Sequence, residues 1–223
     1  MSLYEDKEKE VLEHMKNYDE ESCKLLRNHE WTEGTAVKAF LRKCEIRFKN
    51  DELITVSQGN QPPDVRFRNA NFEVTEVQDD ERKRDDEYRD KIKKNEQAKC
   101  LQDLEPPQDF TDFTPIPMEF PEVLEKIQKG MNIKYCKYNS PEICRDLDLL
   151  VYVNLKRHDL PPHKNKIRVS PKFLDEAKTQ GWRSISFLTK SYAGVVFGQK
   201  STPVFIKQLE GVMKSGNYND FED

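Results

Sequence analysis

Apolar residues recur along the chain at two spacings, one typical of helices and one typical of strands. Helical spacing from Ala36 to Cys44 predicts a core helix over 32–48 that is capped by Thr32. A nearly continuous apolar run from Leu147 to Leu155 predicts a strand buried on both faces, and therefore a central position in a sheet. Weaker patterns predict helices over 4–29, 79–100, 121–139, 171–180 and 203–214, and strands over 53–56, 64–67, 71–77, 184–188 and 193–197.

These elements and the length of 223 residues fit one α/β domain with an extension. We expect residues 1–29 to form a charged helical extension and residues 30–223 to form the α/β domain. Five prolines predict an irregular loop at 105–121, because proline continues neither a helix nor a central strand. The helix that follows this loop is predicted to expose its lysines, which are Lys126, Lys129, Lys134 and Lys137.

The composition is that of a folded but very polar protein, with 35% hydrophobic and 35% charged residues. No apolar run approaches the roughly 20 residues that span a bilayer. The first residues are rich in Lys and Glu, where a signal peptide would be apolar. Five cysteines without a C-x-x-C pair indicate reduced thiols rather than disulfides. We therefore expect a cytoplasmic protein with no membrane partner.

Charge is distributed unevenly along the chain. The net charge of −4 argues weakly against a nucleic-acid partner, but residues 1–122 carry 20 basic and 30 acidic side chains, whereas residues 123–223 carry 17 and 11. A local basic field can attract phosphate on an acidic protein, because salt limits exposed charges to a reach of about 10 Å. The alternative is an ordinary solvated surface.

Two cysteines and two histidines form the one combination that suggests zinc: Cys136, Cys144, His158 and His163. The histidine spacing suits zinc, but the cysteine spacing does not. The alternative is that the cysteines pack as small apolar residues and the histidines lie on a polar loop.

Two carboxylates on neighbouring predicted strands suggest a different metal site. Asp64 begins one strand and Glu73 lies within the next, so a tight pairing of the strands brings them together. With the carbonyl oxygen of Val74, they would supply hard oxygen ligands for Mg²⁺, and water and phosphate would complete the octahedron. The strand period of two places Glu76 on the opposite face, which makes it a poorer candidate. The alternative is a surface hairpin with solvated carboxylates.

The order of elements and several sequence blocks resemble known nucleases. A helix, three strands, a helix and a buried strand follow the order of the PD-(D/E)xK nuclease core. The blocks PPDVRF at 62–67, FEV at 72–74, DEYRD at 86–90, LDLLVYVNLKR at 147–157 and GWRSIS at 181–186 look like those of a small bacterial family of unknown function that is usually described as endonucleases. The resemblance covers roughly residues 30–200.

The resemblance implies a restriction-endonuclease-like α/β/α sandwich with a mixed central sheet, in which Asp64 and Glu73 bind the metal. The superfamily places a lysine two residues after the glutamate, but this chain has Thr75 there. A cation from elsewhere could replace it. Lys156, at the end of the buried strand, is favoured because a strand end is a rigid platform. The other candidates are Arg82 and Lys83.

The resemblance also draws attention to Glu33, because the first core helix of the superfamily sometimes supplies a further acidic ligand. The alternative is a helix-dipole role, since acids are favoured in a first helical turn without any metal.

The leading hypothesis is a metal-dependent endonuclease that hydrolyses phosphodiester bonds of DNA with Mg²⁺ or Mn²⁺. The first alternative is a catalytically inactive nuclease-fold module that binds nucleic acid or a protein partner. Another is a regulatory protein whose residues 1–29 dock a partner. The expected partner is nucleic acid, with DNA favoured over RNA. A homodimer is an alternative that the sequence leaves open.

Overall fold

The computed structural model describes residues 11–14, 16, 29–57, 59–78, 93–103, 116–155, 158–160 and 167–215. The chain divides into two compact units, one of residues 1–32 with 80–114 and one of residues 33–79 with 115–223. The predicted extension over 1–29 falls within the first unit, and its role as a separate domain stays a prediction.

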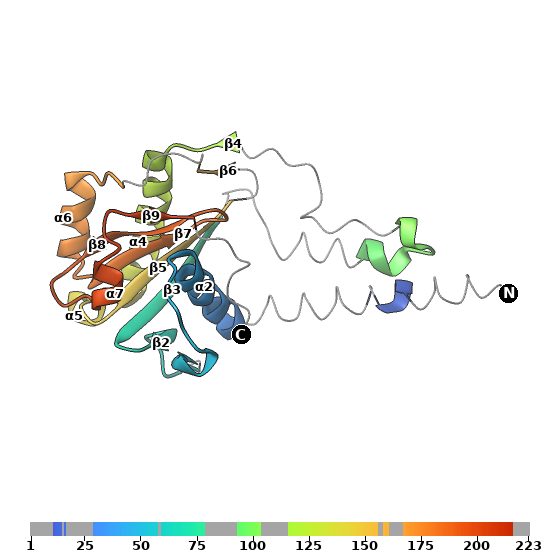
Figure 1. Ribbon diagram of the computed structural model, residues 1–223, viewed down its shortest axis with the longest axis horizontal. Coiled ribbons are helices and arrows are strands. Elements are labelled where there is room, and N and C mark those ends of the chain that lie inside the picture. The colour runs from blue at the N-terminus through green and yellow to red at the C-terminus, as the bar shows by residue number, and fades with distance from the viewer. Residues whose placement is uncertain are drawn as a thin grey trace. The chain divides into compact units, whose positions relative to one another are not determined.

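Seven strands of the larger unit form a mixed sheet in the order β1-β2-β3-β5-β7-β8-β9 (Figure 1). The strands are β1 (Leu53–Thr55), β2 (Val65–Phe67), β3 (Ala70–Gln78), β5 (Asp148–Asn154), β7 (Ser184–Leu188), β8 (Ala193–Gly198) and β9 (Met213–Lys214). β3, β5 and β7 are parallel, and the remaining neighbours are antiparallel. Every predicted strand is present, with each end within one residue of its predicted position.

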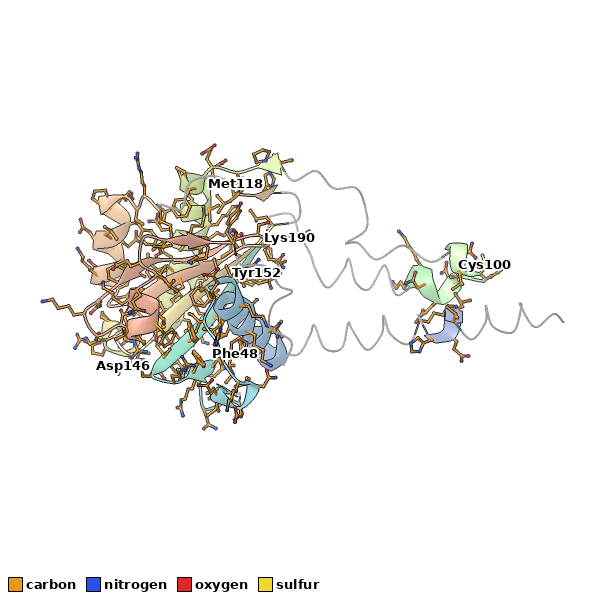
Figure 2. The ribbon with its side chains drawn as sticks, in the orientation of Figure 1. Phe48, Cys100, Met118, Asp146, Tyr152 and Lys190 are labelled. Carbon is orange, nitrogen blue, oxygen red and sulfur yellow. The ribbon has the colours of Figure 1, made fainter. Side chains whose placement is uncertain are left out.

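Helices cover both faces of this sheet. One face packs against α2 (His29–Lys43) and α7 (Val204–Lys207), and the other packs against α4 (Phe120–Tyr138), α5 (Pro141–Cys144) and α6 (Pro171–Thr179). Successive residues of a strand point to opposite faces of a sheet. In β5, Leu149 and Val151 therefore pack in the core on the α4 side, and Leu150 packs in the core on the α2 side. Met118 packs within the core on the α4 side, and Tyr152 packs against the core on the α2 side (Figure 2).

The predicted α/β class is therefore confirmed as a seven-stranded mixed sheet flanked by helices. The doubly buried central strand is also confirmed, since β5 lies between β3 and β7 in the sheet. None of the helices in the described part of the chain combines the length and apolarity that crossing a bilayer needs.

Two predicted helices are shorter than the hydrophobic pattern suggested. The helix predicted over 32–48 runs from His29 to Lys43, so the prediction that Thr32 caps it is wrong, and Glu45 then takes a left-handed conformation with φ of 59°. The prediction of a final helix over 203–214 is wrong beyond Lys207. Gly211 has a φ of 78°, which stops a right-handed helix, and the chain then forms β9 against β8. An apolar spacing that suits a helix thus also suited a turn followed by an edge strand.

Short elements in the predicted loop and beyond it had no signal in the sequence. Within the loop predicted at 105–121, Ile116–Pro117 forms β4, which pairs in parallel with β6 (His158–Asp159). Residues 104–115 lie outside the described residues. The single turn of α5 begins at Pro141, and the Ser140 hydroxyl caps it by accepting the N–H of Ile143.

The helices predicted over 4–29 and 79–100 are described only in part. Residues 11–14 and 16 are helical, as are residues 93–97, and the rest of both predictions lies outside the described residues. The Lys16 ammonium donates to the carbonyl oxygens of Glu96 and Ala98, at 3.2 and 2.8 Å. These bonds satisfy carbonyl groups at the end of the second helix, which have no partner within it.

Candidate metal centre

The hairpin of β2 and β3 brings the two predicted carboxylates together. Val65 and Phe72 are partners in the antiparallel register, and the Asp64 N–H donates to the Phe72 carbonyl oxygen at 2.9 Å. The next pair in this register is Asp64 and Glu73, and side chains of such a pair lie on the same face of a sheet. Both residues are fully buried, so these carboxylates are not those of a solvated hairpin.

Each carboxylate has one oxygen that accepts hydrogen bonds and one that has no hydrogen-bond partner among the described residues. Asp64 Oδ2 accepts the Val74 N–H at 2.7 Å and lies 3.4 Å from the Lys134 ammonium. Glu73 Oε1 accepts from Lys134 at 2.5 Å and from the Tyr138 hydroxyl. Asp64 Oδ1 and Glu73 Oε2 are buried without a hydrogen-bond partner among the residues that the structure describes. An unsatisfied buried acceptor costs about 1–3 kcal/mol, so these two oxygens favour a bound donor or cation.

Lys134 projects from α4 onto both carboxylates, and the prediction that it is exposed is wrong. Only 12% of its side chain is exposed. Charge-assisted hydrogen bonds of this kind are the strong ones, because donor and acceptor are both ionised. A single, partly buried ammonium therefore offsets part of the charge of two buried carboxylates.

The close approach of α4 to the sheet is made possible by Gly130, one turn before Lys134. A Cβ at this position would lie 2.8 Å from Val151 Cγ1 and 3.0 Å from Thr75 Cγ2. Such distances are closer than side chains normally pack, so only glycine lets the helix lie this near. The Thr75 side chain, at 8% exposure, is covered by this helix. Position 75 consequently has no room for the lysine that the nuclease motif places there.

Glu33 on α2 lies close enough to this site to respond to its charges. Burial, followed by the charge of Asp64, raises the pKa of Glu33 to about 7. Glu33 Oε2 is also buried and has no hydrogen-bond partner in the described part of the chain. Because α2 begins at His29, Glu33 lies beyond the first turn, where the helix dipole acts most strongly. The helix dipole is therefore the weaker account of this residue.

Tyr138 follows Lys134 by one turn of α4 and holds the same oxygen of Glu73. Burial and then the hydrogen bond to Glu73 raise the pKa of the Tyr138 hydroxyl, so this group stays a protonated donor. Neither Lys134 nor Tyr138 was predicted from the sequence as a site residue.

The other cations proposed from the sequence are not described. Lys156, Arg82 and Lys83 all lie outside the described residues. Ligation by the Val74 carbonyl oxygen stays a prediction, although its N–H does fix Asp64.

The four-residue zinc hypothesis is only partly covered by the structure. Cys136 is exposed and Cys144 is buried, and both are free thiols. His158 is in β6, and His163 lies outside the described residues. The described portion of the chain contains no group of three or more His, Cys, Asp or Glu side chains that could hold a metal ion.

Magnesium does not require such a group. It keeps several of its waters and often binds protein through one or two carboxylates. Asp64 Oδ1 and Glu73 Oε2 are two buried oxygens of this kind without a hydrogen-bond partner among the described residues, and Glu33 does not form a ligand group of three with them. The residues present therefore fit a small hard cation.

The fold and this site define an α/β protein with a buried carboxylate pair held by a helix lysine. The chain belongs to the family described as "Putative endonuclease, protein of unknown function (DUF1780)", which matches residues 7–216. The family expected from the sequence blocks is thus confirmed at this level.

Similarity to other known proteins adds support for the fold. A solved structure described as "Protein of Unknown Function PA4535 from Pseudomonas aeruginosa strain PAO1, Monooxygenase Superfamily" is similar, with a TM-score of 0.61 and 23% sequence identity over 93% of this chain and 95% of that one. At this identity the likeness shows the fold alone, because one fold hosts many activities. No curated protein matches the chain.

Proposed function

We propose that this protein is a metal-dependent endonuclease that hydrolyses phosphodiester bonds of DNA, with a core of the PD-(D/E)xK type and Mg²⁺ or Mn²⁺ as its cation. The observation that carries the proposal is the carboxylate pair. Asp64 and Glu73 are fully buried, and each is fixed through one oxygen while the other oxygen has no partner in the part of the chain that the structure describes. The family description supports the same class of activity.

In this proposal Asp64 and Glu73 hold the cation through Oδ1 and Oε2, with Glu33 and the Val74 carbonyl oxygen as further ligands. A bound divalent cation supplies the chemistry of polarising a phosphodiester and activating a water. Val74 fixes Asp64 by its N–H, and Tyr138 fixes Glu73 by its hydroxyl. Preorganised ligands of this kind need no rearrangement when the substrate binds.

In this proposal Lys134 is the cation that replaces the motif lysine, a role that was predicted for Lys156 from the sequence. Its ammonium contacts both carboxylates, so it lies where it can neutralise charge that develops on a phosphate. The lysine of the nuclease motif is then replaced by one from a helix rather than from the strand that carries Glu73. Lys156 stays a prediction.

The test is cleavage of a supercoiled plasmid by the parent and by Asp64→Asn and Glu73→Gln in Mg²⁺ or Mn²⁺. The parent is expected to cleave, and each substitution is expected to lower the rate by a factor of at least about 100, since loss of a single well-placed electrostatic contact costs this much in other enzymes. Asp175→Asn is the matched control, because the Asp175 side chain on α6 is 77% exposed. Unchanged cleavage by Asp64→Asn would refute the proposal.

The departure at Thr75 favours a second candidate, the catalytically inactive module that binds nucleic acid or a protein partner. This candidate predicts that the parent binds DNA with a steep salt dependence and leaves the plasmid intact with either cation. The plasmid experiment therefore separates the two.

A further inference from the structure

The last turns of α4 present two lysines to Glu73, and the two differ in exposure. The Lys134 ammonium lies 2.5 Å from Glu73 Oε1, and its side chain is 12% exposed. The Lys137 ammonium lies 3.9 Å from the same oxygen, and its side chain is 52% exposed. Lys134 is thus an internal counter-charge, whereas Lys137 stands where the site meets solvent.

Two contacts hold the Lys137 ammonium at this position. It is attracted by the fully buried Glu73 carboxylate, and it lies 5.1 Å from the centre of the Tyr138 ring. An ammonium above an aromatic face is attracted by the ring quadrupole. At 3.9 Å it makes no hydrogen bond with Glu73, whose Oε1 already accepts from Lys134 and Tyr138. Within the described part of the chain the Lys137 ammonium makes no hydrogen bond, so its N–H groups are available to an anion.

Lys137 also sits in the last turn of α4, where a cation favourably meets the negative end of the helix dipole. That structural role would explain a lysine here without any ligand. It would not explain an effect of Lys137 on the salt dependence of binding, so the two roles can be separated by measurement.

We infer that Lys137 binds a backbone phosphate of the nucleic acid next to the position of cleavage. The inference rests on the proposed function, which places a phosphodiester beside Asp64 and Glu73. A lysine binds phosphate as a point charge through any of its three N–H groups and reads no base. Lys137 thereby contributes affinity for any sequence rather than preference for one.

The experiment measures binding of a fluorescein-labelled DNA duplex by anisotropy in Mg²⁺ between 50 and 200 mM KCl. All proteins carry Asp64→Asn, which the proposed function requires to be inactive, so the duplex stays intact. Loss of one phosphate contact lowers the slope of log K against log salt by about 0.9. Lys137→Gln is therefore expected to lose about 3.5-fold less affinity than its parent over this fourfold range of salt. It should weaken binding equally for two duplexes of unrelated sequence.

Lys137→Arg and Lys178→Gln serve as controls, and both are expected to keep the parent slope. Arginine retains the charge at position 137, and Lys178 is an exposed lysine on α6 that pairs with Asp175. A parent slope in Lys137→Gln, or the same decrease in Lys178→Gln, would overturn the inference while leaving the proposed function in place. Cleavage of the duplex by Asp64→Asn, or no binding by any of the proteins, would instead contradict the proposed function and with it the inference.

Discussion

Lys134→Met tests whether one helix lysine stabilises the two buried carboxylates. Methionine roughly preserves the length of the side chain and removes its charge. Asp64 and Glu73 are fully buried, and Lys134 is the ammonium hydrogen-bonded to both. Removing one partner of a buried ion pair costs about 3–5 kcal/mol, because a buried charge is left uncompensated. We therefore expect the free energy of unfolding at pH 8 to fall by about this amount.

Urea denaturation, followed by circular dichroism, measures this loss. With a slope of about 2 kcal/mol per molar urea, the midpoint should move down by about 2 M. The matched control is Lys178→Met, since that side chain is 63% exposed and its change should stay within about 0.5 kcal/mol. A loss below about 1 kcal/mol for Lys134→Met would show that the lysine does not carry this role.

The same variant gives a second readout through metal binding. Without the ammonium, Asp64 and Glu73 attract a divalent cation more strongly, because the competing positive charge is gone. A ligand at one hundred times its dissociation constant stabilises a protein by about 2.7 kcal/mol. Mn²⁺ is therefore expected to restore more stability to Lys134→Met than it adds to the parent. An equal effect of Mn²⁺ on the two proteins would contradict a cation site at these carboxylates.

Two further predictions concern the neighbours of this lysine. Gly130→Ala should destabilise the protein by about 1–2 kcal/mol in urea denaturation, because the new Cβ overpacks Val151 and Thr75; a gain of about 1 kcal/mol, as alanine brings to an open helix position, would refute the close approach of α4. Glu33 has its pKa raised to about 7, so in the absence of metal its contribution to stability is complete below about pH 4.5 and is lost as the pH rises through 7. The stability of the parent relative to Glu33→Gln should fall over that range in metal-free buffer, and a difference that is constant with pH would contradict the placement of Glu33 beside Asp64.

Strands β2, β3, β5, β7 and β8 could be predicted closely because their buried apolar residues recur at strand spacing. β5 is apolar at nearly every position, since Leu149 and Leu150 face different cores and both are buried. The hairpin that carries Asp64 and Glu73 could be predicted in the same way, because the period of two assigns each residue to a face. Their meeting follows from the register, with Val65 opposite Phe72.

The C-terminal segment shows where an apolar pattern fails. Ile206, Leu209 and Met213 have a spacing that suits a helix, yet only Val204–Lys207 is helical. The segment ends as β9 because β8 offers a sheet edge to Met213 and Lys214. That edge is formed by residues distant in the sequence, so no local pattern contains it.

Lys134 was predicted to be exposed because it is charged, although its position along α4 places it on the buried face of the helix. Ile127, Gly130 and Met131 form the buried face of α4, and Lys134 and Tyr138 continue that face at helical spacing. The same period that places Ile127 in the core therefore places Lys134 against the sheet. Burying a charged side chain on an apolar face is costly unless an opposite charge lies beside it. Asp64 and Glu73 provide two such opposite charges for Lys134.

The glycine, the lysine and Thr75 are parts of one arrangement. Gly130 lets α4 approach until Thr75 is covered, which removes the space for a lysine on the strand. The same approach brings Lys134, one turn along, within hydrogen-bond distance of Glu73. In this chain the helix supplies the cation, so the absence of lysine at position 75 does not leave the two carboxylates without a positive charge.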